Sequence, residues 1–157
     1  MADHGVGWLA RKQLAERVGV DHAAALSSGT GALTAWLPAL AEGGQAAITE
    51  CSWLTGEPPE VARRYWQVGY PTMGTVDANV AAAEECGYAV IDVFTLRRAS
   101  WVEGYYDHLA PRAEALAGHA DPLVRQLVAE TREELALFDA AGDSYGYVFY
   151  LLERRMD

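Results

Sequence analysis

The residues Glu50, Cys51, Ser52 and Trp53 place a carboxylate, a thiol, a hydroxyl and an indole next to one another. They come at the end of residues 45–50, whose apolar character and length predict a buried strand. Open α/β sheets bind their ligands outside the carboxyl ends of the strands. We therefore expect these four residues to form the rim of a pocket.

Two residues are candidates for acid–base catalysis, Glu50 and His108. Partial burial at a strand end would raise the pKa of the Glu50 carboxyl and suit it to accept a proton, whereas the alternative is an ordinary solvated or hydrogen-bonded acid. For His108 the alternative is a surface histidine. Cys51 has no base nearby in the sequence to activate its thiol, so a nucleophilic role is disfavoured.

Large apolar and aromatic side chains follow this rim and recur at the start of a later helix. Such side chains line pockets for small ligands, and the alternative for each is packing in the core. Core packing is what we expect of Trp66 and Tyr106. The residues that we predict to bind a substrate are Trp53, Tyr65, Tyr70, Met73, Trp101 and Tyr105.

Length and charge limit the class of protein. The chain has 157 residues, which fits one domain, and a net charge of -10 at pH 7. Because an anionic protein repels phosphate backbones and anionic membrane surfaces, we expect neither nucleic acid nor a membrane as a partner. The sequence has no apolar run of about 18 to 20 residues and no secretory pattern at its start, so we expect a soluble, cytoplasmic protein.

The two cysteines, Cys51 and Cys86, are expected to be free and buried, as thiols of cytosolic chains usually are. No Cys-x-x-Cys or His-x-x-x-His spacing is present, and the four histidines are scattered. We therefore expect no metal site.

The strands and helices that the sequence predicts must position these residues. Residues 20–26 fit either a short strand or a loop, and the acidic series Glu130, Glu133 and Glu134 indicates a solvated helix face. The predicted strands are 45–50, 88–96 and 145–153, and the predicted helices are 8–18, 32–41, 59–68, 76–86, 100–117 and 122–141. The helical pair between the last two strands lets them lie side by side and antiparallel. This pattern predicts an α/β fold, with helices on the faces of a sheet of at least three strands.

An ordered series of short segments carries a resemblance to a known family. The segments are Trp36 to Leu40, Ile48 to Leu54, Tyr70 to Val76, Ala83 to Tyr88, Trp101 to Tyr106 and Asp143 to Tyr150. The series, over roughly residues 33–153, resembles the carboxyl-terminal half of small-molecule class I S-adenosylmethionine-dependent methyltransferases. The resemblance implies a Rossmann-like sheet in which residues 45–50 are the fifth strand. It also implies that residues 145–153 insert antiparallel between that strand and residues 88–96.

The amino-terminal part departs from that family. Its members bind S-adenosylmethionine with a glycine-rich turn and with an acidic residue that holds the ribose, yet only about 33 residues precede the matching region here. We therefore expect a truncated domain, with a divergent segment 1–32 and a family-like region 33–157. Gly5 and Gly7 resemble the glycine turn and Asp21 resembles the ribose-binding acid, although ordinary loops and helix caps are the alternative.

Three functions follow from this resemblance. The first is a truncated or rearranged methyltransferase acting on an organic small molecule. The second is a cyclase or isomerase on the same scaffold, with Glu50 as its base, and the third is a non-catalytic partner subunit. If the strands that normally flank residues 45–50 are missing, that strand has a bare edge, so we expect a homodimer or a partner chain to cover it.

Overall fold

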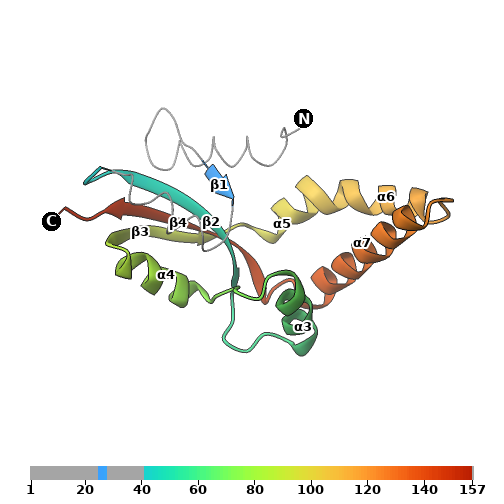
Figure 1. The fold of residues 1–157 in the computed structure, drawn as a ribbon, viewed down its shortest axis with the longest axis horizontal. Coiled ribbons are helices and arrows are strands. Elements are labelled where there is room, and N and C mark those ends of the chain that lie inside the picture. The colour runs from blue at the N-terminus through green and yellow to red at the C-terminus, as the bar shows by residue number, and fades with distance from the viewer. Residues whose placement is uncertain (1–24, 28–40, 157) are drawn as a thin grey trace.

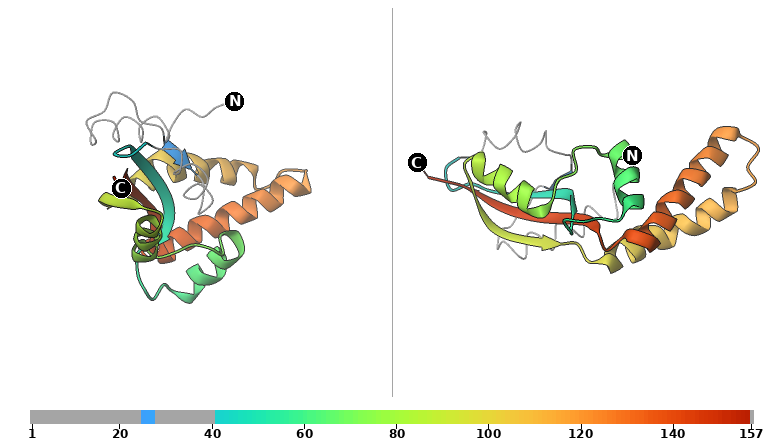
Figure 2. Two further views of the ribbon diagram at one scale, coloured as in Figure 1. Left: turned by 60° about the vertical axis from the view of Figure 1, so that its left-hand side comes forward. Right: turned by 90° about the horizontal axis from the view of Figure 1, so that it is seen from below.

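The computed structural model of the chain describes residues 25–27 and 41–156. Four strands form one sheet in the order β1-β2-β4-β3 (Figure 1). Their bounds are Ala25–Ser27 for β1, Gln45–Trp53 for β2, Tyr88–Thr95 for β3 and Tyr145–Arg154 for β4. The helices of these residues lie beside this sheet and at one end of it (Figures 1 and 2). The predicted α/β class is confirmed.

The last strand of the chain, β4, occupies the middle of the sheet. It runs antiparallel to β2, with Ile48 opposite Tyr150, and antiparallel to β3, with Val93 opposite the same tyrosine. Most side chains of β4 are buried, which explains why its sequence is a nearly continuous run of aromatic and branched residues. The predicted antiparallel insertion of this strand is confirmed.

The strand β2 is longer than the sequence predicts. Its last three residues stay paired with β4, so that Cys51 lies opposite Tyr147 and Trp53 opposite Tyr145. The backbone N–H of Trp53 also donates to the carbonyl of Gly74 over 2.9 Å. Glu50 to Trp53 are therefore part of the strand itself, and not a rim beyond its end.

The outer edge of β2 is not bare. Strand β1 pairs with it in parallel, from Ala25 opposite Ala47 to Ser27 opposite Thr49. Farther along, Trp53 forms a parallel bridge with Thr75. The expectation of an uncovered edge at residues 45–50 is therefore wrong for residues 47–49, because a short strand from the preceding segment covers them.

Five α-helices of the described residues have the following bounds: Glu60–Gly69 (α3), Val76–Glu85 (α4), Arg98–Trp101 (α5), Asp107–Leu116 (α6) and Pro122–Ala141 (α7). Side chains cap two of them where the sequence predicts a start. Thr75 accepts a hydrogen bond from the N–H of Ala78, and Asp121 accepts one from the N–H of Leu123. The predicted helix 8–18 and most of 32–41 lie outside the described residues.

The predicted helix 100–117 is three elements in the structure. A π-helical turn, η2, spans Val102–Tyr106 between α5 and α6. Helices α6 and α7 then run side by side as a pair that extends away from the sheet (Figures 1 and 2). No helix in the described part of the chain is both long and apolar enough to cross a membrane.

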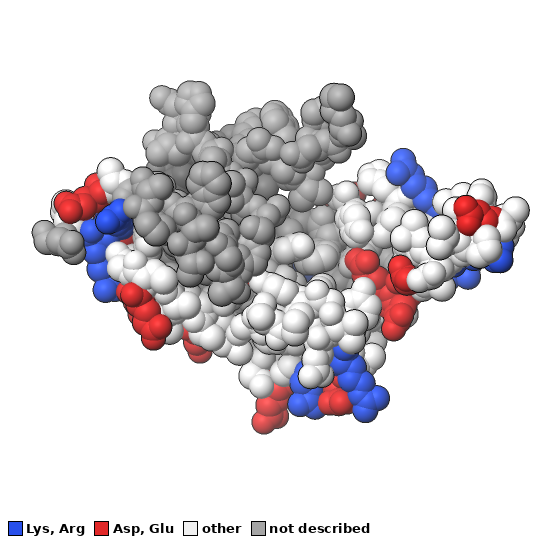
Figure 3. Space-filling model, viewed as in Figure 1, with Lys and Arg blue, Asp and Glu red and all other residues white. Residues whose placement is uncertain are grey.

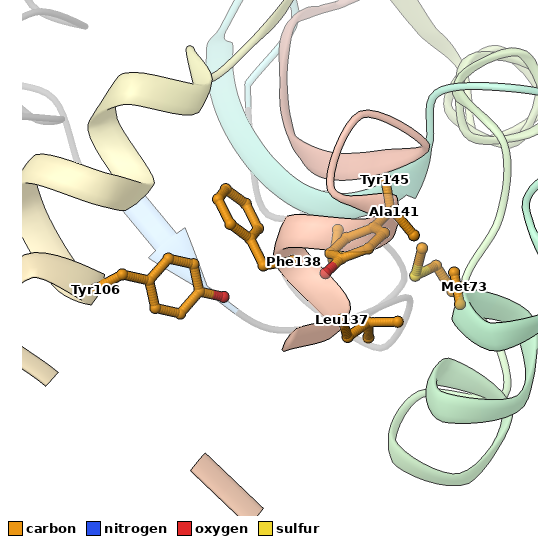
Figure 4. Close-up of a cluster of buried hydrophobic side chains, with 8 residues drawn as sticks. Met73, Tyr106, Leu137, Phe138, Ala141 and Tyr145 are labelled. Carbon is orange, nitrogen blue, oxygen red and sulfur yellow. The ribbon is translucent and has the colours of Figure 1, made fainter. Parts of the chain in front are cut away.

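Of three buried clusters in the described residues, two pack helices against the sheet. The first joins α4 to the sheet and contains Ile48, Ala83, Tyr88, Val148, Tyr150 and Leu152. The second joins the end of β2 and β4 to α3, η2 and α7, and contains Cys51, Ala62, Met73, Tyr106, Leu137, Phe138, Ala141 and Tyr145. Figure 4 shows Tyr106 and Phe138 close to each other in this second cluster, with Met73 on the far side of Tyr145.

Candidate functional site

A cavity of about 500 Å³ opens where α3, the α5–η2 segment, α7 and β4 meet. We call it the aromatic pocket. Its walls come from residues far apart in the sequence, namely Tyr65, Trp66, Leu96, Ser100, Trp101, Tyr105, Glu134 and Tyr147. Three of the predicted substrate-binding residues, Tyr65, Trp101 and Tyr105, are thus brought together in one place.

The π turn η2 explains how one short segment supplies so much of this wall. A π turn has more residues per turn than an α-helix, so side chains four and five positions apart lie on nearly the same side. Trp101 and Tyr106 accordingly stack with their ring centroids 6.1 Å apart, and Tyr105 contacts Tyr106 at 5.1 Å. The turn lets Tyr106 enter the core, as predicted, while Tyr105 faces the pocket.

Trp101 is fixed on more than one side by other rings. Its indole stacks on Tyr147 of β4 at 4.9 Å, with an interplanar angle of 12°. Phe138 of α7 lies 5.8 Å from the indole and 4.6 Å from Tyr106. Such packing holds the pocket wall in one arrangement before any ligand arrives.

Glu134 supplies the negative charge of the pocket. It is half-buried, and the hydroxyl of Tyr106 donates a hydrogen bond to it over 3.0 Å. The expectation of a solvated acidic face on α7 is therefore wrong for Glu134, although Glu130 and Glu133 are exposed. Figure 3 shows acidic side chains gathered over this helix.

The phenols of the pocket are held in their neutral form. Burial raises the pKa of Tyr65, Tyr105 and Tyr147, and the negative charge of Glu134 raises all three further. At neutral pH these tyrosines therefore offer rings and O–H groups, and no charge. Trp66 adds an indole N–H that is buried without a hydrogen-bond partner among the described residues.

Glu50 lies apart from this pocket. Its side chain is only 6% exposed, and the hydroxyl of Tyr70 donates a hydrogen bond to its carboxylate. Burial raises the pKa of the Glu50 carboxyl. Since successive residues of a strand point to opposite faces, Glu50 faces away from Cys51 and its cross-strand neighbour Tyr147, which lines the pocket.

A cluster of three polar side chains next to Glu50 connects α4 to the sheet by hydrogen bonds. The hydroxyls of Ser52 and Tyr150 are 2.9 Å apart, and the side-chain amide of Asn79 donates to both, over 3.0 and 3.1 Å. Gly74 packs against this amide so closely that a Cβ there would lie 2.8 Å from the Asn79 oxygen. The Ser52 hydroxyl thus makes its hydrogen bonds to neighbours within the fold, so its role is structural.

The remaining predicted residues are distributed as follows. Met73 is buried in the second cluster, and Trp53 and Tyr70 pack against that cluster without lining the aromatic pocket. His108 is exposed on α6 and does not line the pocket either. The catalytic roles of Glu50 and His108 stay predictions.

Both cysteines are free, as expected. Cys51 is buried, and burial together with the nearby Glu50 raises the pKa of its thiol to about 12, which disfavours a nucleophilic thiolate. Cys86 is exposed, which corrects the expectation that both are buried, because it follows the end of α4. Gly5, Gly7 and Asp21 lie outside the described residues, and within 25–27 and 41–156 no group of three or more His, Cys, Asp or Glu is arranged to hold a metal ion.

Comparison with known proteins shows the fold of this chain alone. No family model matches the sequence, and no curated protein matches it. Among solved structures, YjhP from Escherichia coli superposes with a TM-score of 0.63 at 20% identity, over 92% of this chain and 69% of that one.

Two further structures extend this comparison. An S-adenosylmethionine-dependent methyltransferase from Geobacter sulfurreducens, solved with S-adenosylhomocysteine, superposes with a TM-score of 0.64 at 20% identity, over 85% of this chain and 57% of that one. The [4+2]-cyclase SpnF superposes with a TM-score of 0.51 at 14% identity, over 74% of this chain and 40% of that one. This chain therefore has the fold of S-adenosylmethionine-dependent methyltransferases, and it spans less than two thirds of the length of these last two proteins.

Proposed function

We propose that this protein is of the S-adenosylmethionine-dependent methyltransferase type and acts on an organic small molecule held in the aromatic pocket. The observation that carries the proposal is the pocket itself, which opens on a methyltransferase fold. Its volume of about 500 Å³ suits a small molecule, and its walls are mostly apolar with a few polar groups.

The described residues would supply the substrate side of such a site. Tyr65, Trp101 and Tyr105 would hold an acceptor by its apolar surface and limit its motion, which is the main contribution a protein makes to methyl transfer. S-Adenosylmethionine, when bound, supplies an electrophilic methyl group. Its proposed contacts, at Gly5, Gly7 and Asp21, lie outside the described residues, so the fit of the cofactor depends on those positions.

A second candidate function is a cyclase or isomerase on the same scaffold, which would need no methyl transfer. The observation that favours it is the buried Glu50, since burial raises the pKa of its carboxyl toward the range of a general base and Tyr70 holds it in place. The likeness to SpnF shows that a cyclase has this fold. A non-catalytic subunit is the third candidate.

The assembly and the compartment also stay predictions. We propose a homodimer or a complex with a partner chain, because a groove of about 1230 Å³ between α3 and α7 includes the exposed side chains of Val61 and Val68. For the homodimer, light scattering should give about twice the 17.0 kDa of one chain. The two free cysteines are consistent with the proposed location in the cytoplasm, where thiols usually stay reduced.

Transfer of a labelled methyl group tests the proposed function. The full chain is incubated with methyl-labelled S-adenosylmethionine and a set of small amines, phenols and carboxylic acids, and the labelled product is measured. We expect transfer to at least one acceptor, and a loss of roughly tenfold or more in rate for Tyr105→Ala, which removes one wall of the pocket. The matched control is Val68→Ala, which changes an exposed side chain of the neighbouring groove. Equal transfer by both variants would place the reaction elsewhere.

A further inference from the structure

We propose that the aromatic pocket selects an organic cation, specifically an alkylated ammonium group, and that Glu134 is its counter-charge. The inference rests on the proposed function in that it names the ligand class of the same pocket. It follows from three observations on the described residues: the rings of the wall, the single formal charge among them, and the pairing of the nearby arginine.

The wall consists mainly of aromatic rings. Five residues supply them, from α3, the α5–η2 segment and β4: Tyr65, Trp66, Trp101, Tyr105 and Tyr147. The rings of Tyr65 and Trp66 stand at 83° to each other with their centroids 5.3 Å apart, and so form a corner. The negative faces of such rings attract cations, and tryptophan does so most strongly.

Charge in the pocket has one sign. Among the described residues Glu134 is the one acidic residue of its lining, and no lysine, arginine or histidine of 25–27 and 41–156 lines it. The tyrosines stay neutral because burial and Glu134 both raise the pKa of their hydroxyls. An anionic ligand would therefore meet repulsion without any compensating cation, whereas an ammonium group would pair with Glu134 among apolar walls that strengthen the attraction.

The arginine of α5, Arg98, is engaged elsewhere. The Arg98 guanidinium pairs with Asp143 at 3.2 Å, donates to the carbonyl of Phe138 at 3.2 Å, and lies 4.2 Å from the centroid of the Phe138 ring. These contacts hold its charge at the carboxyl end of α7. It is therefore not available to neutralise Glu134, which accepts a hydrogen bond from the neutral hydroxyl of Tyr106.

Two probes of the same shape test the proposal directly. Choline carries a trimethylammonium group, and 3,3-dimethylbutan-1-ol replaces its nitrogen by carbon and has no charge. In calorimetric titrations of the full chain without cofactor, we expect choline to bind about tenfold more tightly than the neutral alcohol or better. Equal affinities, or tighter binding of the alcohol, would overturn the proposal.

Matched variants locate the effect. Glu134→Gln keeps an oxygen that can accept from Tyr106 but removes the charge, so the ratio of the two affinities should fall severalfold, and the rings account for what remains. Glu133→Gln removes the same charge at the neighbouring exposed position and should leave most of the ratio in place. A ratio that falls equally in both variants would mean that the general negative field, and not the pocket, attracts the cation.

A third titration separates this inference from the proposed function and from the other organic cation that the fold suggests. If S-adenosylmethionine or S-adenosylhomocysteine displaces choline, the cofactor and not an ammonium ligand occupies the pocket, which would overturn the assignment. Choline binding that persists in their presence supports the assignment. Because no transfer is measured, selective choline binding stands even if the methyl-transfer assay fails.

Discussion

The hydroxyl of Tyr106 donates to the carboxylate of Glu134 over 3.0 Å, and so joins the π turn η2 to the long helix α7. This hydrogen bond explains why one glutamate of an acidic series turns inward. It also places this carboxylate, the acidic side chain that the described residues contribute to the aromatic pocket, at a fixed position among the rings. Structure and proposed ligand recognition therefore depend on the same pair.

Replacing Tyr106 by phenylalanine should destabilise the protein. The ring would stay in the core, but Glu134 would lose its partner in a half-buried place, and hydrogen bonds to charged groups contribute roughly 1.5 to 3 kcal/mol. Urea unfolding measures the loss. The control is Tyr105→Phe, because that tyrosine is 43% exposed and should change the free energy of unfolding by less than about 0.5 kcal/mol. Similar effects of both changes would contradict the role given to the pair.

Glu50 should make stability depend on pH. Burial raises the pKa of its carboxyl above the usual 4.5, so between that value and the raised one the folded state binds more protons than the unfolded state. Its contribution to stability is therefore full below pH 4.5 and is lost as the pH rises through the raised value. Urea unfolding at several pH values should show Glu50→Gln gaining stability over the wild type as the pH rises. The exposed control Glu57→Gln should show no such trend, and a trend of opposite sign for Glu50→Gln would contradict the burial argument.

Gly142 should not tolerate a side chain. A Cβ at this position, just after α7, would contact the carbonyl oxygen of Phe138, the Arg98 guanidinium and the Phe138 ring closer than van der Waals distance allows. Because a backbone carbonyl cannot move aside cheaply, we expect Gly142→Ala to cost about 1 to 3 kcal/mol of unfolding free energy. Gly118→Ala is the matched control, since nothing lies within 4 Å of a Cβ there. Thermal or urea unfolding of the two variants should separate them clearly.

Local signals in the sequence predicted much of this fold. The β-rich run of β4 and the Asp-Pro start of α7 are strong enough to predict these elements nearly to the residue. The length of β2 was not predictable, because its last residues are held by β4 and by Gly74, both distant in the sequence. The π turn was not predictable either, since a helical pattern of the same residues fits an unbroken α-helix.

The site was predicted only in part, for a similar reason. Aromatic residues after the strand 45–50 and at the start of a later helix indicated a pocket wall, and Tyr65, Trp101 and Tyr105 do line one. Glu134 was missed because Glu130, Glu133 and Glu134 look alike in the sequence, and only the contact with Tyr106 distinguishes the last. Tyr147 was missed because alternation in a strand does not say which face meets a pocket.

Calorimetric titration of S-adenosylmethionine into the full chain tests the central claim most directly. The account predicts saturable binding in the micromolar range, weakened about tenfold or more by Asp21→Ala and unchanged by the exposed Glu42→Ala. Absence of binding at millimolar concentrations, by a chain that still unfolds cooperatively, would contradict a methyltransferase function and leave the cyclase, isomerase or non-catalytic subunit.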